Sequence, residues 1–358
     1  MVSTALLVSL ALGLLVAPLA AEAQQGGKVY RIGYLTAFSA EQERPVLAPM
    51  RDLLRERGWA EGQNLVFEWR YAEGNYERLP ELAAELVRLQ LDLFVARGGP
   101  ATTAAKRATA TVPIVTWGTA DPVGIGLVAS LARPGGNVTG LSEDVAPEII
   151  GKRLQMLKEV APTVSKVAIL TRVIPPAVVP RITAYDNALE AGAKTLGLQF
   201  QLWRLQGPDD IDKTFTTLLR EGFGALDVAY VPVTWIHRRQ ILDLAVKHRL
   251  PAIYHHRSYA LDGGLMAYGA DEREVPRRLA DYVDKILRGT KPADLPVEQP
   301  TKFDLVINVK TAKALGITFP HSILFQPPRR SSSPDGVPGR VCRHAGGAST
   351  RCSTHVRS

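Results

Sequence analysis

Cysteine is scarce in this chain of 358 residues, which has two, Cys342 and Cys352, both close to the C-terminus. The rest of the chain therefore offers no thiol for nucleophilic catalysis and no thiolate ligand for zinc. A body without cysteine suits an exported protein that folds without disulfides.

Motifs for nucleotide binding and covalent hydrolysis are also absent. The first predicted strand continues as IGYLTAFSA rather than G-x-G-x-x-G, and neither G-x-x-x-x-G-K-[ST] nor G-x-S-x-G occurs. The adjacent His255 and His256 would point to opposite faces of a strand, and no H-x-x-x-H pair accompanies them. We therefore predict no metal, no cofactor and no catalytic residue, and keep a doubly wound enzyme as an alternative function.

A single apolar run is long enough to suggest export or membrane insertion. It extends from Leu6 to Val16 and is followed by Ala21-Glu22-Ala23, a small-x-small cleavage pattern. The run is shorter than the ~20 residues of a spanning helix, so a signal peptide at 1–23 is favoured over a membrane anchor. The sequence thus predicts a periplasmic protein.

The net charge is +8, but its distribution argues against nucleic-acid binding. Residues 327–358 contain six Arg and one Asp and account for +5 of that charge. This tail is rich in Pro, Ser, Gly and Arg and poor in apolar side chains, so we predict that residues 326–358 are disordered. Because these basic residues do not belong to a folded surface, we predict no nucleic-acid partner.

Short apolar strands alternate with helical stretches from Val29 onward, which predicts βαβ units and a mostly parallel sheet with helices on both faces. A first lobe at 28–143 has predicted strands at Tyr30–Leu35, Leu65–Tyr71, Leu91–Ala96, Pro113–Trp117 and Val138–Leu141. Its predicted helices are Pro45–Arg57, Tyr76–Leu89, Ala101–Ala108 and Gly124–Leu131.

A second lobe at 144–268 repeats this plan, so the predicted fold class is α/β with two doubly wound Rossmann-like lobes. Its predicted strands are Val167–Thr171, Gln199–Arg204, Leu226–Val231 and Ala252–His255. Its predicted helices are Pro147–Val160, Val179–Leu196, Asp209–Glu221 and Ile236–His248. We expect the remaining chain to return to the first lobe at about 270–300 and to the second lobe at about 301–325.

Two loops of the first lobe leave neighbouring predicted strands at the same edge of the sheet. Gly98–Thr103 opens a helix and Trp117–Pro122 follows the next strand, so free backbone N–H groups and threonine hydroxyls meet there and can hold a carboxylate. An ordinary helix start with threonine caps is the alternative for the first loop. Asp121 either neutralises an ammonium group or forms an Asx-type turn before Pro122.

Further candidates follow other predicted strands. Thr36 and Phe38 come after the first strand, where Phe38 offers a stacking face. In the second lobe, the candidates at predicted carboxyl ends of strands are Arg172, Thr234, Trp235 and Tyr254. Their position predicts that they close over a ligand held by the first lobe.

Four long blocks carry a resemblance to a known family. They are DPVGIGLVASLARPGGNVTGLS, EGNYERLPELAAELVRLQLDLFVARGGPATTAAK, KHRLPAIYHHRSYALDGGLMAYG and YVDKILRGTKPADLPVEQPTKFDLVINVKTAKALG, within about 29–320. The chain resembles the bacterial ABC-transporter substrate-binding family related to tryptophan and tyrosine binders, which has the type I periplasmic-binding fold. The resemblance implies three crossings between lobes, near Ser142–Pro147, Gly263–Ala270 and Pro296–Phe303. The family usually ends in a short apolar and acidic segment, so the tail here is atypical.

The resemblance also implies roles for the first-lobe loops. Thr102 and Thr119 would donate hydrogen bonds to an amino-acid ligand, and the backbone would complete the cradle. The backbone residues in these loops are Gly99, Ala101, Gly118 and Ala120.

The implied function is capture of a small organic solute, with an aromatic amino acid favoured, in the cleft between the lobes. The hinge would close on the solute, and the closed protein, expected to be a monomer, would deliver it to an ABC permease in the inner membrane. A sensory or regulatory module of the same fold is an alternative, although the predicted signal peptide argues against it and no helix-turn-helix region precedes Val29.

Overall fold

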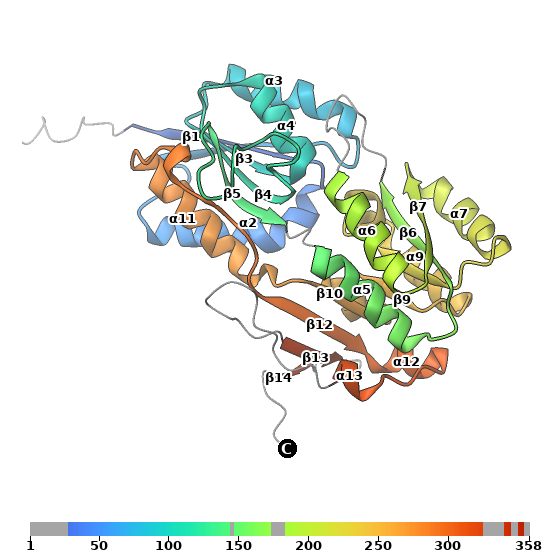
Figure 1. Cartoon of the computed structure of the whole chain (residues 1–358). Helices are drawn as coiled ribbons and strands as arrows, with labels where there is room; N and C mark the ends of the chain where they lie inside the picture. Colours follow the sequence, from blue (N-terminus) through green and yellow to red (C-terminus); the bar gives the residue numbers. More distant parts are fainter. Residues whose placement is uncertain (1–27, 144–146, 173–182, 325–339, 345–349, 354–358) are drawn as a thin grey trace, which may run out of the picture.

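The computed structural model describes residues 28–143, 147–172, 183–324, 340–344 and 350–353, and it contains two α/β lobes (Figure 1). The predicted signal peptide at 1–23 lies outside the described residues. None of the described helices is both long and apolar enough to cross a membrane.

The first lobe is built on a parallel sheet of six strands in the order β11-β5-β4-β3-β1-β2. Apolar residues fill the central strands, and β3 is buried along its whole length, as expected for a sheet covered on both faces. The strands are β1 (Tyr30–Thr36), β2 (Leu65–Tyr71), β3 (Leu93–Arg97), β4 (Ile114–Ala120), β5 (Val138–Glu143) and β11 (Val297–Glu298).

Helices cover both faces of this sheet. One face is covered by α2 (Ala40–Glu56) and α11 (Val275–Leu287), which lie side by side although they are far apart in the sequence (Figure 1). The other face is covered by α3 (Leu79–Arg88) and α4 (Gly98–Ala108). The short 3-10 helix η2 (Tyr76–Arg78) precedes α3.

The second lobe is built on a mixed sheet of eight strands in the order β14-β13-β12-β10-β9-β8-β6-β7. All neighbours are parallel except β10 with β12 and β13 with β14. The strands are β6 (Lys166–Arg172), β7 (Gln199–Leu205), β8 (Ala225–Val228), β9 (Ala252–Tyr254), β10 (Met266–Ala270), β12 (Phe303–Asn308), β13 (Arg340–His344) and β14 (Thr350–Ser353).

Two groups of helices enclose the second sheet. The first group packs on one face through a core that includes Phe215 and Ile241, and it comprises α7 (Pro208–Arg220), α8 (Pro232–Ile236), α9 (Arg238–Lys247) and α10 (Arg257–Leu261). The second group packs on the other face through a core that includes Leu154 and Leu189, and it comprises α5 (Pro147–Val160), α6 (Thr183–Thr195), α12 (Val309–Leu315) and α13 (His321–Leu324).

The chain passes between the lobes where β5 leads to α5, where β10 leads through η3 (Glu272–Glu274) to α11, and where β11 leads to β12. Between α11 and β11 lies the 3-10 helix η4 (Pro292–Asp294). The two sheets are therefore linked through segments that lie close together, since β11 pairs with β5 and Ser142 Oγ donates a hydrogen bond to Glu298 O at 3.2 Å.

Apart from shifted bounds and elements for which no expectation was stated, the structure differs from the expected elements at three places. The helix expected at Gly124–Leu131 is wrong, because this segment is a chain of turns in which Gly126 adopts a φ of 72° and Leu127 N bonds to Pro122 O at 2.8 Å. The helix expected at Ile236–His248 is present as α9 but begins later, at Arg238, because the chain turns at His237 after the separate short helix α8.

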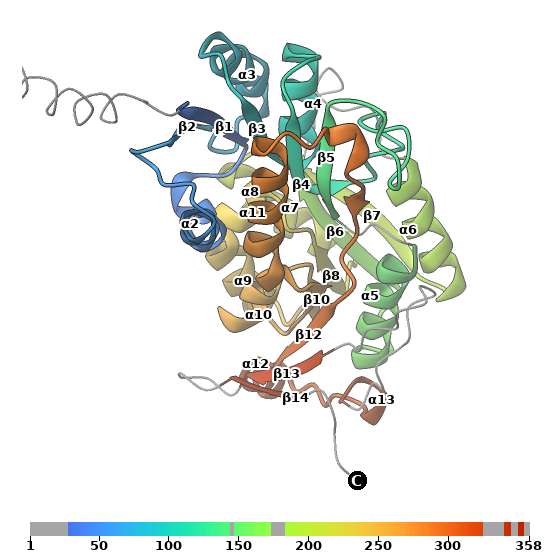
Figure 2. The same cartoon turned by 90° about the vertical axis from the view of Figure 1, so that its left-hand side faces the viewer.

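The third difference concerns the tail, where disorder is expected but β13 and β14 are strands (Figure 2). Figure 2 shows β12, β13 and β14 following one another away from β10 at the lower edge of the molecule. Strand pairing uses backbone groups, so the free edge of β12 accepts an extended segment even where that segment has few apolar side chains. The other residues of the predicted tail beyond Leu324 lie outside the described residues.

Candidate functional site

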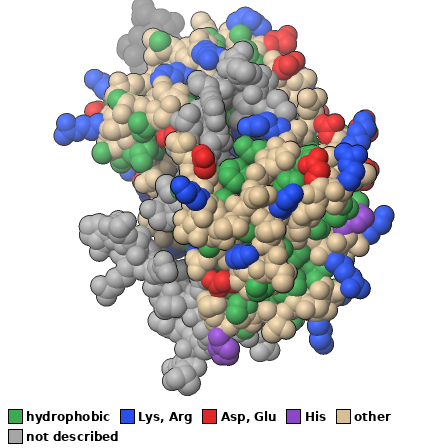
Figure 3. Space-filling view, turned by 45° about the vertical axis from the view of Figure 1, so that its right-hand side comes forward, with side chains coloured by type: hydrophobic (Ala, Val, Ile, Leu, Met, Phe, Trp, Pro, Cys, Tyr) green, Lys and Arg blue, Asp and Glu red, His purple; other side chains and the backbone are tan. Residues whose placement is uncertain are grey.

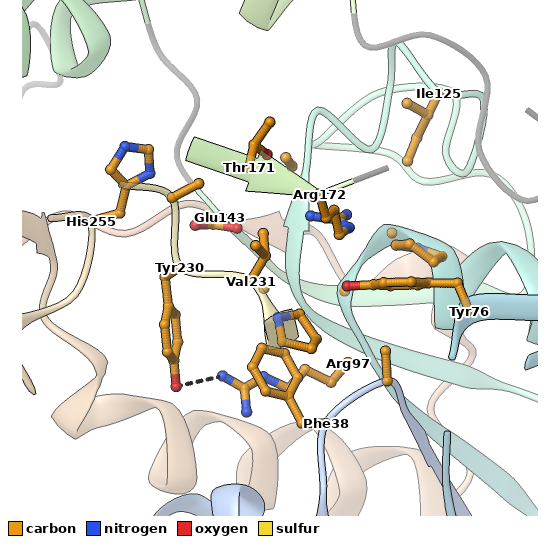
Figure 4. Close-up of a pocket in the computed structure, with 18 of the residues that line it drawn as sticks. Phe38, Tyr76, Arg97, Ile125, Glu143, Thr171, Arg172, Tyr230, Val231 and His255 are labelled. Carbon is orange, nitrogen blue, oxygen red and sulfur yellow. Dashed lines mark hydrogen bonds between the residues drawn. The ribbon is translucent and has the colours of Figure 1, made fainter. Parts of the chain in front are cut away.

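A cavity of about 160 Å³ lies between the two lobes (Figure 4). The volume is several times the roughly 30 Å³ that one water occupies in the liquid, so the cavity has room for a small solute. The carboxyl ends of β1, β3 and β4 reach it from the first lobe, and those of β6, β8 and β9 reach it from the second. This is the edge at which open α/β sheets bind ligands.

Glycines form part of the first-lobe wall because the backbone turns sharply there. Gly98 has a φ of 81° and Gly118 a φ of 65°, a region that residues with a Cβ rarely adopt. The wall is therefore made of backbone at these two points, which leaves peptide groups close to the cavity.

Arg97, the last residue of β3, is a deeply buried cation of the site. Its guanidinium lies between two aromatic rings, 3.8 Å from the centroid of Phe38 and 4.1 Å from that of Trp117. Its Nη1 donates a hydrogen bond to Glu43 Oε1 at 3.0 Å, and the side chains of both residues are almost completely buried. Burial by itself lowers the pKa of Arg97, but the Glu43 carboxylate raises it above its ordinary value, so the pair is ionic.

Glu43 is held by the first lobe alone. Tyr34 Oη donates to Glu43 Oε2 at 2.7 Å, and Thr36 Oγ1 donates to Glu43 Oε1 at 2.7 Å. Burial and the nearby Glu43 carboxylate raise the pKa of Tyr34 well above its ordinary value, which keeps the hydroxyl available as a donor. The carboxylate thus has three charged or polar donors and fixes the Arg97 guanidinium in place.

Tyr230 reaches the same guanidinium from the second lobe. Arg97 Nη2 donates to Tyr230 Oη at 3.3 Å, and the Phe38 and Tyr230 rings are 5.7 Å apart (Figure 4). Behind it, the Tyr230 ring stacks on His256 at 4.3 Å, and His256 Nε2 lies 3.5 Å from a carboxylate oxygen of Glu272 in η3. Burial raises the pKa of Tyr230 to about 12, so it remains a neutral phenol.

An ionic cluster forms the second-lobe wall. Asp227 at β8 bonds to His255 Nε2, and Arg153 Nε of α5 lies 4.0 Å from Asp227 Oδ2. Burial raises the pKa of Asp227, but the contacts with His255 and Arg153 lower it overall. Burial and the Arg153 charge lower the pKa of His255 despite the opposing effect of Asp227. A neutral imidazole therefore donates to an ionised carboxylate.

Glu143 and Arg172 face the cavity from the ends of β5 and β6 (Figure 4). The Glu143 side chain is accessible from the cavity, yet protein groups of both lobes surround it. Loss of hydration raises its pKa to about 7, the Glu272 charge adds to the increase, and Arg153, Arg172 and Arg97 oppose it. Arg172 lies over the ring of Tyr76 from the first lobe, with Cζ 5.1 Å from the ring centroid.

The structure brings together five of the residues predicted from the sequence. Phe38, Gly99, Gly118, Ala120 and Arg172 all line the cavity. They lie at or just beyond the carboxyl ends of β1, β3 and β4 in the first lobe and of β6 in the second, as the argument from carboxyl ends of strands predicts.

Four other predicted residues of the first lobe lie behind the cavity wall. Thr102 and Thr119 are fully buried, and their hydroxyls bond to Thr116 at 2.6 Å each rather than facing the cavity. Thr36 is directed to Glu43, and Ala101 is buried in the apolar core beneath α4. The two threonines therefore hydrogen-bond to other residues of the first lobe and not to a ligand. Side chains of a buried strand, or of the first turn of a helix, point into the protein as often as toward the cavity.

The remaining predicted residues also have partners within the protein. Asp121 Oδ1 accepts a hydrogen bond from Gly124 N at 2.9 Å, as the turn interpretation predicts. Thr234 Oγ1 donates to the carbonyls of Ala229 and Val231, just before α8. Tyr254 stacks on Tyr259, and Trp235 packs edge-on against Tyr230 from outside the cavity.

The sequence reasoning missed most of the charged and aromatic lining. The missed residues that carry charge or a ring are Tyr76, Arg97, Glu143, Arg153 and Tyr230. Arg97 directly precedes Gly98, and a charged residue at the carboxyl end of an otherwise apolar strand is a signal that could have identified it. Arg153 gives no such signal, since it lies on a helix whose orientation only the fold determines.

On the face shown in Figure 3, Lys and Arg side chains are interspersed with Asp, Glu and apolar ones. Among the described residues, no group of three or more His, Cys, Asp or Glu is placed to hold a metal ion.

Comparisons with known proteins agree with this architecture. Residues 46–330 match the protein family described as ABC transporter substrate binding protein. A tyrosine-binding protein of Clostridioides difficile is 26% identical over 265 residues, which cover 73% of this chain and 74% of that protein.

Two solved structures are similar over most of the chain. A conserved domain protein from Vibrio cholerae is 26% identical with a TM-score of 0.74, and the similarity covers 83% of this chain and 98% of that one. The ABC domain in complex with L-Trp from Streptococcus pneumonia is 25% identical with a TM-score of 0.73 and the same coverage. These neighbours confirm the predicted fold of two doubly wound lobes, and the family that the chain matches is one of substrate-binding proteins.

Proposed function

Since the chain belongs to the family of ABC transporter substrate-binding proteins, we propose that it binds an aromatic amino acid between its lobes and delivers it to an ABC permease. The observation that carries the proposal is the composition of the cavity wall, to which both lobes contribute an aromatic ring and a charged group. Phe38 and Tyr76 come from the first lobe and Tyr230 from the second. Such a wall accommodates a planar apolar side chain and a charged end at the same time.

Two relatives support the choice of an aromatic ligand. One is named a tyrosine-binding protein, and another was solved with L-Trp. The aromatic rings around the cavity are compatible with either side chain, and the site is proposed for this class of solute.

The proposed mechanism is closure of the lobes around the solute. Three chain segments connect the lobes, and a ligand that contacts both walls favours the closed arrangement by the difference in its affinity for the two states. The closed form would then be the one recognised by the permease, outside the cytoplasmic membrane after removal of the predicted signal peptide.

A thermal-shift screen tests the proposal. The mature protein is heated with each of the twenty amino acids, and with ribose and glucose as solutes of another class. We expect L-tryptophan or L-tyrosine to raise the melting temperature, because a ligand at one hundred times its Kd stabilises the folded state by about 2.7 kcal/mol. Mass spectrometry should recover the solute unchanged.

Small-angle scattering then tests closure. The radius of gyration should fall when the stabilising amino acid is added and remain constant with ribose. A chain that responds to none of the twenty amino acids would contradict the proposal.

A further inference from the structure

The charges that line the cavity are not all compensated within the protein. Arg97 is paired with Glu43, and Arg153 lies beside Asp227. Among the described lining residues this leaves one cation, Arg172, and one anion, Glu143, without an ion pair. The cavity therefore presents one positive and one negative charge to whatever it binds.

The second-lobe arginines also have unused donors. Arg153 is 5% exposed, and its Nε has no hydrogen-bond partner among the described residues; the nearest carboxylate oxygen, of Asp227, is 4.0 Å away. The Nε of Arg172 is likewise buried without a partner in this part of the chain. A buried guanidinium N–H without an acceptor is costly, so two such groups at one cavity wall indicate a place for an anionic acceptor.

Glu143 supplies the complementary charge from the connection between the lobes. It is the last residue of β5, directly before the first crossing, and its side chain is accessible from the cavity. Paired carboxylate and ammonium groups satisfy each other in such a partly desolvated site, whereas an unpaired carboxylate there is costly.

We infer that Arg172 and Arg153 bind the α-carboxylate of the ligand and that Glu143 accepts hydrogen bonds from its α-ammonium group, so that the cavity selects zwitterionic amino acids. The inference rests on the proposed function and specifies the side chains that bind the charged α-carboxylate and α-ammonium groups of the ligand. The first-lobe threonines expected to play this part are occupied with each other. The aromatic wall of Phe38 and Tyr76 is then left for the ligand's side chain.

Ammonium recognition by Glu143 couples binding to pH. Burial raises the pKa of Glu143 to about 7, so this carboxyl group is mostly protonated in the free protein below pH 7. The Glu272 charge also favours the protonated form, whereas the charges of Arg97, Arg153 and Arg172 favour the ionised form. His255 on the adjacent wall is kept neutral by its lowered pKa. An ammonium ligand requires the ionised carboxylate, so affinity must decrease as the pH falls through 7.

Isothermal titration with three probes tests the inference. They are L-tryptophan, tryptamine, which lacks the carboxylate, and indolepropionate, which lacks the ammonium group. At pH 8 the wild type should bind L-tryptophan at least about tenfold more tightly than either analogue, since each charge-assisted hydrogen bond contributes roughly a factor of ten or more.

Two substitutions should change the affinities for the two analogues in opposite patterns. Glu143→Gln should lower the affinity for L-tryptophan about 10- to 100-fold but change the affinity for indolepropionate by less than about threefold. Arg172→Gln should weaken the binding of L-tryptophan and of indolepropionate but change the affinity for tryptamine little. Arg172→Lys should restore part of the lost affinity. The matched controls are Glu221→Gln and Arg204→Gln, which change exposed second-lobe residues that do not line the cavity.

The pH series adds an independent readout. Wild-type affinity for L-tryptophan should fall by up to about tenfold per pH unit below 7, and Glu143→Gln should remove this dependence.

Each outcome decides one of the two proposals. If the wild type binds L-tryptophan but Glu143→Gln leaves the ratio of L-tryptophan to indolepropionate affinity unchanged, the inference is overturned and the proposed function stands. If the wild type binds no amino acid in the thermal-shift screen, the proposed function fails and the inference fails with it. For a protein that prefers L-tyrosine, tyramine and hydroxyphenylpropionate replace the two analogues.

Discussion

Arg97 at the end of β3 donates a hydrogen bond to the hydroxyl of Tyr230, 3.3 Å away, and so joins the first lobe to the second across the candidate binding cavity. The guanidinium cannot move far, because Phe38, Trp117 and Glu43 hold it on the first-lobe side. Under the proposed closure mechanism, the position of Tyr230 relative to this fixed group would report how closed the cavity is.

Tyr230→Phe should favour a more open arrangement. The substitution removes the hydroxyl that receives the Arg97 N–H while keeping the ring that stacks on His256. Because a hydrogen bond to a charged group contributes about 1.5–3 kcal/mol, we expect affinity for the amino-acid ligand to fall by at least about tenfold. Titration calorimetry measures the affinity, and small-angle scattering measures the radius of gyration.

Tyr71→Phe is the control for this substitution, since Tyr71 lies on β2 away from the cavity and stacks on Trp69. Equal affinities of Tyr230→Phe and the wild type would show that the contact does not contribute to closure.

Glu43→Gln should lower stability more than most single changes in this protein. It leaves the buried Arg97 cation without its counter-charge, and breaking a buried ion pair in this way costs about 3–5 kcal/mol. Urea unfolding measures the loss in the free energy of unfolding. Glu41→Gln, an exposed change two residues away, should stay within about 0.5 kcal/mol of the wild type, and a similar small change for Glu43→Gln would contradict the structural role.

Thr119→Val separates a structural role from a ligand-binding one. In the structure the Thr119 hydroxyl bonds to Thr116 at 2.6 Å and is fully buried, so its removal should cost about 1–2 kcal/mol of stability. Ligand affinity should stay within about threefold of the wild type, since the hydroxyl does not face the cavity. A loss of affinity without a loss of stability would instead support the role implied by the family resemblance.

His255→Gln should change how stability depends on pH. The folded protein lowers the pKa of His255 below its ordinary value of 6.5, so the unfolded chain takes up a proton first as the pH falls. His255 therefore favours folding above pH 6.5, and this contribution decreases as the pH falls below 6.5 toward the folded-state pKa. Between pH 7.5 and pH 5.5 the wild type should lose more stability than His255→Gln.

Melting temperatures at half-unit pH intervals measure this difference. Glu143 acts in the opposite direction, because its folded-state pKa is raised to about 7 and its protonation favours folding as the pH decreases. His248→Gln, a change away from the cavity at the end of α9, is the matched control. Parallel curves for wild type and His255→Gln would rule out the buried imidazole as a source of acid sensitivity.

The predicted strands agree closely with the structure because local sequence determines them. Leu65–Tyr71 and Val167–Thr171 are recognisable as short runs of apolar and β-branched residues between turn signals. In the structure β2 has the predicted bounds, and β6 is one residue longer at each end. The segment 124–131 was misjudged because its apolar spacing resembles a helix, whereas Gly126 in a left-handed conformation turns the chain instead.

The sequence by itself determined the two-lobe α/β architecture, the family, and the strand ends at which a ligand would bind, because periodic patterns and long matching blocks are local properties. Tertiary structure alone decided which side chains at those ends face the cavity. Thr102 and Thr119 turn inward to each other, while Arg97, Glu143, Arg153 and Tyr230 are brought together from distant positions. The direction in which a side chain points, and the opposite charges that lie beside it, depend on how helices and crossing segments pack around the sheets. A local sequence pattern does not contain this information.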